Sequence, residues 1–384
     1  MTQIRPLLLL FATASLLACG TRSSDAGGKS ATRPTDGAFA IGVGATQEKS
    51  NFQGVTRGLQ LAIERLNADA ASQNLRFAAR LPDAGASSVV QIAQQLRDDP
   101  SVIAVVGHPE SGTSLEAIPV YADEEHGHEN AVVAISPTAS SPRLTGVNPW
   151  FFRVAPSDNE TSRLVAAYVA DSLKVRTVAV IYRNDSYGRD WSARFAETFT
   201  ARNGTVLARI PYLTKITEWD AYALQLKKLA PEVLLFPGDA DDAIAMLRAL
   251  RKHEVNLTFV GGDATAGIAR TQEFPDAKYT AFFLPERATS AEGKRFVEQF
   301  RARFNEDPDM YAALSYDAAI AIGRTVIAGA RDRKAVRDAL EKIDGTRAIE
   351  GAGGKIAFDP KHDITGRTIV IATVRSSKAK GDAK

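Results

Sequence analysis

The chain has 384 residues, of which 45% are hydrophobic and 24% are charged. Its 47 lysines and arginines nearly balance its 45 aspartates and glutamates, which argues against a nucleic-acid-binding protein, because such domains carry a clear basic excess. Cys19 is the only cysteine, so the sequence excludes an internal disulfide and a cysteine-based metal cluster.

Residues 1–18 have the layout of a secretory signal peptide. One arginine precedes an apolar run from Leu7 to Leu17, which is shorter than the about 20 residues that a membrane-spanning helix needs. The sequence Leu-Leu-Ala-Cys that ends at Cys19 resembles a bacterial lipobox, in which the cysteine becomes the lipidated first residue of the exported protein. We therefore expect a lipid on Cys19; the alternative is an ordinary signal peptide followed by a chance cysteine.

The two ends of the exported chain are expected to lack fixed structure. Residues 19–37 are small and polar with no periodic apolar face, which is typical of a flexible linker. Residues 377–384 are rich in lysine and indicate a solvated tail rather than a binding arm. The remaining body of about 340 residues is long enough for two domains.

Short apolar runs then alternate with longer segments of helical spacing. In the first half we expect strands at 39–45, 75–81, 102–107 and 131–136, with helices over 54–67, over 89–96 and between the last two strands. The second half predicts helices at 160–173, 190–202, 219–229 and 241–252, and strands at 177–182, 205–210, 233–236 and 257–262. The largely helical segment 291–342 and two short strands at 353–358 and 367–374 complete the body.

The apolar runs are continuous and β-branched, which is typical of parallel strands that are covered by helices on both faces. Two successive, doubly wound α/β units therefore fit the pattern best. In such sheets, ligands bind outside the carboxyl ends of the strands. Five polar loops leave these ends, at 107–113, 136–142, 183–190, 237–242 and 261–266.

Several motifs of the body resemble an extracytoplasmic solute-binding protein of the type I periplasmic-binding fold, in the leucine/isoleucine/valine-binding branch. The resemblance covers about residues 38–375 and is carried, in order, by VVGHPESGTS, AISPTASSPRLT, FFRVAPSD, VAVIYRNDSYG, FVGGDA, YAALSYDAA and GGKIAFDPKHD. It implies two α/β lobes joined by three crossings, with the ligand between the lobes. The crossings are expected near 154–158, 285–288 and 343–350, which assigns 38–155 and 287–342 to lobe one, and 156–286 and 343–376 to lobe two.

Hydroxyl groups gather in two neighbouring loops. Ser111 and Thr113 lie where a helix is expected to begin, and the free N–H groups and positive dipole of a helix start suit a carboxylate. Thr138 and Ser140 can add hydroxyls to the same anion. The alternative is that Ser111 and Ser140 only cap helices.

The resemblance also implies roles for single residues. Ser111 and Ser140 match positions that bind an α-carboxylate, Tyr187 matches a tyrosine that closes over the ligand, and Asp263 matches an acid that pairs with an α-ammonium. The family more often has glutamate at the position of Asp263 and threonine at that of Ser140.

The pocket departs from the family pattern where it should hold the ligand's side chain. The loop FPGDADD lacks the aromatic residue that often lines this region. It offers Asp239 instead, with His108 and Glu110 expected across the cleft. The pocket is therefore expected to be more polar than one for an aliphatic side chain.

Other chemistries find less support. Residues 123–129 hold His126 and His128 amid four carboxylates, but this segment leads into a strand at the amino end of the sheet and is expected to be a solvated loop rather than a metal site. The sequence also lacks the G-x-S-x-G, H-E-x-x-H, P-loop and G-x-G-x-x-G motifs. We therefore expect no metal, no cofactor and no enzymatic activity.

Together these features predict a periplasmic, lipid-anchored substrate-binding protein that works as a monomer. It is expected to capture an amino acid or a related amine or amide by hinge closure, and to deliver it to the permease subunits of an ABC importer. The alternative is an exported sensory receptor with the same cleft, and a weaker one is an enzyme on this fold.

Overall fold

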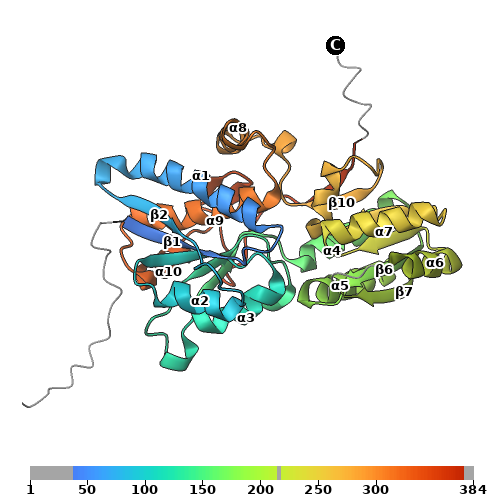
Figure 1. Cartoon of the computed structure of the whole chain (residues 1–384), viewed down its shortest axis with the longest axis horizontal. Helices are drawn as coiled ribbons and strands as arrows, with labels where there is room; N and C mark the ends of the chain where they lie inside the picture. The colour runs from blue at the N-terminus through green and yellow to red at the C-terminus, as the bar shows by residue number, and fades with distance from the viewer. Residues whose placement is uncertain (1–37, 214–217, 376–384) are drawn as a thin grey trace, which may run out of the picture.

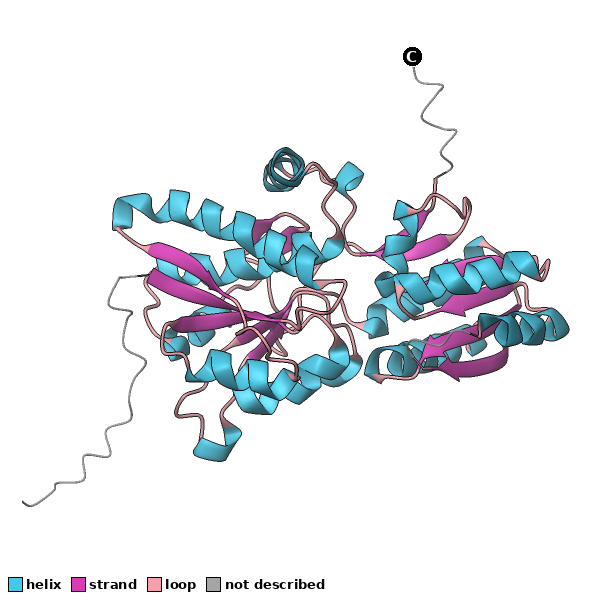
Figure 2. Ribbon diagram, in the orientation of Figure 1, coloured by secondary structure: helices cyan, strands magenta, loops and turns pink. Residues whose placement is uncertain are grey.

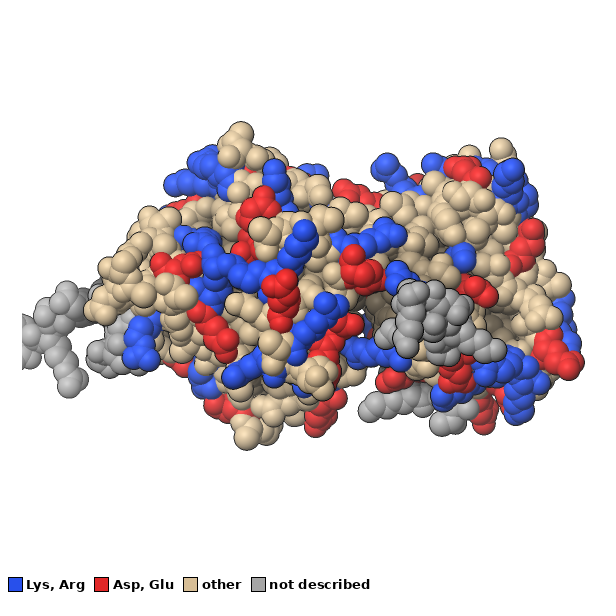
Figure 3. Space-filling model, turned by 90° about the horizontal axis from the view of Figure 1, so that it is seen from above, with Lys and Arg blue, Asp and Glu red and all other residues tan. Residues whose placement is uncertain are grey.

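The computed structural model describes residues 38–213 and 218–375, which form two α/β lobes side by side (Figure 1). The predicted signal peptide, Cys19, the linker and the C-terminal tail at 377–384 lie outside the described residues. Basic and acidic side chains are interspersed on the face drawn in Figure 3, in keeping with the nearly balanced charge of the sequence.

Lobe one is built on a parallel sheet of five strands in the order β2-β1-β3-β4-β5. The strands are β1 (Ala38–Gly44), β2 (Arg76–Arg80), β3 (Val102–Gly107), β4 (Ala134–Ser136) and β5 (Phe151–Arg153). One face packs in a core with α1 (Phe52–Ala70), α8 (Ala291–Phe304), α9 (Met310–Ile327) and α10 (Arg333–Leu340), and the other with α2 (Val89–Asp98) and α3 (Ser111–Tyr121). Helices thus cover both faces of the sheet (Figure 2).

Lobe two repeats this plan with the strand order β13-β10-β9-β8-β6-β7. Its strands are β6 (Thr177–Arg183), β7 (Thr205–Tyr212), β8 (Val233–Phe236), β9 (Thr258–Gly261), β10 (Lys278–Ala281) and β13 (Val370–Thr373), of which only β13 runs antiparallel to its neighbour. Its helices are α4 (Asp158–Ala167), continued by a π-helical turn η4 (Tyr168–Ser172), α5 (Ser186–Thr200), α6 (Trp219–Leu229) and α7 (Ala240–Lys252), with the 3₁₀ segment η5 (Asp263–Arg270) after β9. The predicted fold class, two doubly wound parallel-sheet lobes, is confirmed.

A side-chain cap sets the start of α5. Helix α5 begins at Ser186, four residues before the predicted start at 190, because the side chain of Asp185 accepts a hydrogen bond of 2.9 Å from the N–H of Gly188 and caps the helix. This cap places Tyr187 on the first turn of a helix rather than in a loop. The side chain of Tyr187 is thereby held at the edge of the lobe that faces lobe one.

The first two crossings lie where the chain passes from one core to the other. Val154 and Ala155 belong to the core of lobe one, and α4 begins lobe two at Asp158. Phe282 and Phe283 return to the core of lobe one, just before the short helix η6 (Pro285–Arg287).

The third crossing differs from the prediction near 343–350. The hairpin β11 (Ile349–Gly351) and β12 (Gly354–Ile356) packs on lobe one, and Ile343, Phe358 and Ile364 are buried in the core of that lobe. An ion pair of 2.6 Å between Arg153 and Asp363 holds the same segment. Residues 343–364 therefore belong to lobe one rather than lobe two, and the chain crosses just before β13.

Candidate ligand-binding site

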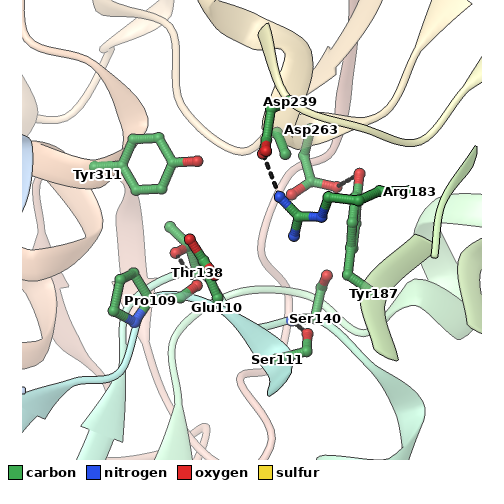
Figure 4. A pocket seen from close by; sticks show the side chains of 11 residues that line it. Pro109, Glu110, Ser111, Thr138, Ser140, Arg183, Tyr187, Asp239, Asp263 and Tyr311 are labelled. Atoms are coloured by element: carbon green, nitrogen blue, oxygen red, sulfur yellow. Dashed lines mark hydrogen bonds and ion pairs between the residues drawn. The ribbon is translucent and has the colours of Figure 1, made fainter. Parts of the chain in front are cut away.

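A cavity opens between the lobes and encloses about 340 Å³ of space, including its part open to solvent. It lies at the carboxyl ends of the strands of both sheets (Figure 4). Eleven residues line it: Pro109, Glu110, Ser111, Thr138, Ser140, Arg183, Tyr187, Asp239, Asp263, Ala264 and Tyr311. Each of the five predicted loops contributes to this wall, because parallel strands bring their carboxyl ends to one edge of each sheet.

Ser111 joins the two hydroxyl-rich loops. It is the first residue of α3, it is 2% exposed, and its Oγ accepts hydrogen bonds from the N–H groups of Ser140 (3.3 Å) and Ser141 (3.1 Å). Among the described residues, its own hydroxyl hydrogen finds no acceptor. Ser111 therefore lines the cavity with a hydroxyl that can still donate a hydrogen bond, at the positive end of a helix.

The alternative that Ser111 and Ser140 only cap helices is wrong. Glu110 occupies the N-cap position of α3 without a side-chain hydrogen bond to the helix. Ser141, not Ser140, caps the short helix η3 (Pro142–Leu144) by accepting from the N–H of Arg143. Ser140 instead donates to the carboxylate of Asp158 at 3.1 Å.

Thr138 lines the cavity, but its hydroxyl already donates to the carbonyl oxygen of Pro109 at 2.6 Å. The hydroxyl of Ser136 donates in the same way to the carbonyl oxygen of His108 at 2.6 Å. These bonds cross from the loop after β4 to the loop after β3. These two hydroxyls thus hold the two loops together, and only Thr138 also lines the cavity.

Asp263 and Asp158 form a buried acidic pair. Asp263 begins η5, is 3% exposed, and accepts a hydrogen bond of 3.0 Å from the hydroxyl of Tyr187 on its Oδ1. Burial raises the pKa of Asp263, although the hydrogen bond from Tyr187 lowers it. Burial and then the charge of Asp263 hold the pKa of Asp158 well above its usual range. Both carboxyls therefore favour a proton more than an exposed aspartate does.

Arg183, the last residue of β6, was not among the predicted site residues. The residue is 5% exposed, and its guanidinium donates to Asp239 through Nη1 and to Asp185 through Nε. It also lies 5.8 Å from the ring centre of Tyr187. A signal was present, since Arg183 opens a predicted cleft loop.

Tyr311 was missed as well. It lies on the first turn of α9, where the side chain of Asp309 caps the helix by accepting from the N–H of Ala312. Its hydroxyl points into the cavity from the side opposite to Tyr187 (Figure 4). The rule of strand ends could not find Tyr311, because no strand precedes it.

Two predicted site residues do not reach the cavity. His108 is 1% exposed and lies 3.0 Å from the hydroxyl of Tyr121, and burial lowers the pKa of His108 to about 3, so its ring is neutral. Thr113 donates its hydroxyl to the carbonyl oxygen of Glu110 on its own helix at 3.0 Å. Neither residue is among those that line the cavity, because each side chain bonds to a neighbour within lobe one instead.

The acidic segment 123–129 lies on lobe one, away from the cavity, and its charged side chains form ion pairs there. Asp123 pairs with His126 at 2.8 Å and with Arg97 at 3.3 Å. Within the described residues, no group of three or more His, Cys, Asp or Glu side chains is placed to hold a metal ion.

Among residues 38–213 and 218–375, no helix combines the length and hydrophobicity that crossing a bilayer requires.

Comparison with known proteins places the chain in a family. Residues 43–381 match the family model described as periplasmic binding protein. An amino acid binding protein of Pseudomonas aeruginosa is 26% identical over 286 residues, which cover 72% of each chain. A leucine-, isoleucine-, valine-, threonine- and alanine-binding protein of the same organism is 24% identical over 314 residues, 80% of this chain and 81% of that protein.

Solved structures share the fold. The branched-chain amino acid transporter substrate-binding protein of Streptococcus pneumoniae, in complex with isoleucine, has a TM-score of 0.79 at 23% identity and covers 88% of this chain and 96% of its own. A solute-binding protein of an ABC transporter from R. palustris, in complex with benzoate, has a TM-score of 0.75 at 15% identity, with coverages of 88% and 94%. The chain therefore belongs to the periplasmic binding protein family.

Proposed function

We propose that this protein is the substrate-binding component of an ABC importer, and that it captures an amino-acid-like solute in the cavity between its lobes. One observation carries the proposal: the hydroxyl of Ser111, at the start of a helix and without an acceptor among the described residues, lines the same cavity as the buried carboxylate of Asp263. A donor at a positive helix end suits a carboxylate, and a buried acid suits an ammonium. The two ends of the cavity therefore complement a zwitterion.

The residues act on the solute from opposite lobes. Ser111 and the N–H groups at the start of α3 bind the carboxylate from lobe one. Asp263 binds the ammonium from lobe two, and the hydroxyl of Tyr187 fixes the orientation of this carboxylate at 3.0 Å. A solute that touches both walls favours the closed arrangement of the lobes, since only that arrangement offers both sets of contacts.

Polar contacts between the lobes support closure by a hinge. Ser141 of lobe one donates to Asp190 of α5 at 2.5 Å, on one side of the cavity. Arg270 of η5 pairs with Asp309 at the start of α9 at 2.6 Å, on another side. Each contact joins side chains of different lobes, so opening the cleft breaks them and closing it restores them.

Calorimetry on the exported protein with a panel of amino acids tests the proposal. A ligand at 100 times its Kd also adds about 2.7 kcal/mol of stability, so thermal unfolding gives an independent screen. Asp263→Asn keeps the shape of the side chain but removes its charge, and breaking a buried pair costs about 3–5 kcal/mol. If Asp263→Asn binds the best amino acid as tightly as the parent protein does, the amino-acid proposal fails.

The proposal includes a lipid anchor at Cys19, which rests on the lipobox-like sequence alone. Replacing Cys19 with serine removes the sulfur that would carry the lipid, so the variant should leave the membrane fraction and lack acyl chains. A Cys19→Ser variant that still partitions with membranes and carries acyl chains contradicts the anchor. An exported sensory receptor is the alternative role, and binding to permease subunits in a reconstituted membrane separates the two roles.

A further inference from the structure

The cavity wall carries more negative than positive charge. Glu110, Asp239 and Asp263 line it with carboxylates, and Arg183 is its one cation among the lining residues. Asp263 is only 3% exposed, and among the described residues Tyr187 is the only side chain that donates a hydrogen bond to it. This carboxylate therefore faces the cavity with an oxygen that no neighbouring side chain satisfies.

Arg183 does not offset these acids as a free cation. Its guanidinium donates to Asp239 and also to Asp185, which lies outside the cavity wall. Two carboxylates already offset the charge of this guanidinium, so it attracts an anionic group of a solute less than an unpaired guanidinium would. Acidic side chains therefore outnumber cationic ones in the cavity wall, and the one lining cation, Arg183, is already paired.

Glu110 and Asp239 remain accessible to a solute. The side chain of Glu110 is 22% exposed, and its partner at 3.2 Å is Lys49, which is 51% exposed and reaches it from the surface. The side chain of Asp239 is 42% exposed, and its bond to Arg183 uses only Oδ1. Both carboxylates therefore keep acceptor positions for a donor that enters the cavity.

The pKa of Tyr311 indicates that the electrostatic potential in this part of the cavity is negative. Burial raises the pKa of its hydroxyl well above the usual range, and the charges of Asp239, Asp263 and Glu110 raise it further. Its ring stands on the side of the cavity opposite to Tyr187 (Figure 4). An aromatic face in this position can cover an alkyl stem or attract a cation.

We propose that the solute is an amino acid whose side chain ends in a cation, an ammonium or a guanidinium, and that Glu110 and Asp239 bind this distal group. The inference rests on the proposed function, which places the α-carboxylate at Ser111 and the α-ammonium at Asp263. An aliphatic side chain would remove water from Glu110 and Asp239 without replacing its hydrogen bonds. A side-chain carboxylate would meet two charges of its own sign.

Calorimetry at pH 7.5 with lysine, ornithine, arginine, glutamine, leucine and glutamate tests the inference. We expect a basic amino acid to bind at least about tenfold more tightly than leucine, because hydrogen bonds between charged groups are the strong ones. Glu110→Gln and Asp239→Asn should each weaken the basic ligand by about tenfold or more, and should leave leucine unchanged or bound more tightly. Circular dichroism and thermal melts establish that each variant is folded.

Asp241→Asn is the matched control. Asp241 lies on the first turn of α7, two residues from Asp239, but it is exposed and does not line the cavity. The substitution removes the same charge from the same helix end, so it should change the affinity for the basic ligand less than about twofold if the effect of Asp239 is one of contact. Equal losses in both variants would overturn the assignment of Asp239.

The outcomes separate the two proposals. Tightest binding of leucine, lost in Asp263→Asn but insensitive to Glu110→Gln and Asp239→Asn, overturns this inference and leaves the proposed function standing. Tightest binding of glutamate overturns it as well. Binding of no amino acid at all overturns the proposed function and this inference with it.

Discussion

The hydroxyl of Ser140 lies 3.1 Å from Oδ2 of Asp158, while Oδ1 of the same carboxyl has no partner among the described residues. Asp158 is fully buried, and its pKa is raised by burial and by the charge of Asp263. A protonated Asp158 can donate to Ser140, which frees the hydroxyl hydrogen of Ser140 for the carboxylate of a solute. Under the proposed function the two acids therefore act on different ends of the solute: a protonated Asp158 donates to Ser140 near the carboxylate, and an ionised Asp263 pairs with the ammonium.

Asp158→Asn should therefore bind the solute nearly as well as the parent protein does. The amide mimics a protonated carboxyl and can still donate to Ser140, whereas Asp158→Ala leaves Ser140 without its partner. We expect Asp158→Ala to lose roughly 1–3 kcal/mol of binding free energy in calorimetry. Equal losses in both variants would show that Asp158 acts as an anion.

Binding should weaken as the pH falls. Burial raises the pKa of Asp263 to about 6, and an ammonium pairs only with the ionised carboxylate. The affinity should be constant above this pKa and should drop by about tenfold for each pH unit below it. Titration calorimetry between pH 4.5 and 8 measures the slope, and a flat profile would contradict the role of Asp263.

The stability of the empty protein should depend on Asp263 in the opposite direction. Because the pKa of Asp263 is raised from 3.8 to about 6 on folding, its contribution to stability is fully present below the unfolded pKa and is lost as the pH rises through the folded one. Asp263→Asn removes this buried charge, so it should stabilise the empty protein at pH 8 relative to the parent protein. Urea unfolding of both proteins at pH 5 and pH 8 checks the sign.

Ser111→Ala should lower both stability and affinity. The variant removes the acceptor for the buried N–H groups of Ser140 and Ser141, which costs roughly 1–3 kcal/mol of unfolding free energy. Thr113→Ala removes a hydroxyl from the same turn of α3 but outside the cavity, so it serves as the control and should change affinity little. A Thr113→Ala variant as weak as Ser111→Ala would remove Ser111 from the site.

The packing of α1 against α9 sets the position of Tyr311. A Cβ on Gly58 would lie 2.0 Å from the carbonyl oxygen of Ala312, so Gly58→Ala should push the helices apart and destabilise the protein by about 1–3 kcal/mol or more. Gly112→Ala adds a Cβ that meets nothing within 4 Å and should be neutral or stabilising. Thermal unfolding of both variants compares the two helical sites.

The ion pair of Arg270 with Asp309 should bias the empty protein toward closure. Arg270 is 70% exposed, so the pair contributes less than about 1 kcal/mol, and Arg270→Ala should weaken binding by less than about fivefold. X-ray scattering should show a larger radius of gyration for the empty variant and an unchanged one with ligand. Arg248→Ala is the control, since Arg248 pairs with Glu273 within lobe two.

The alternation of apolar runs determined most of the fold. The predicted strands 102–107 and 233–236 and the predicted helix 219–229 match β3, β8 and α6 residue for residue. Such runs are readable because each records the burial of its own strand or helix. The five cleft loops followed from the same pattern, since parallel strands end at one edge of a sheet.

Tertiary packing decided which side chains meet. His108 and Glu110 are two residues apart in one loop, yet one is buried against Tyr121 and the other lines the cavity. Tyr311 reaches the site from α9, a helix of lobe one that follows strands β6 to β10 of lobe two in the chain. Residues 343–364 also pack on lobe one, although β13 of lobe two follows them. Apolar periodicity along a segment indicates that one of its faces is buried. It does not indicate which other segment covers that face, because this depends on contacts between segments that are far apart in the chain. Only the folded structure contains those contacts.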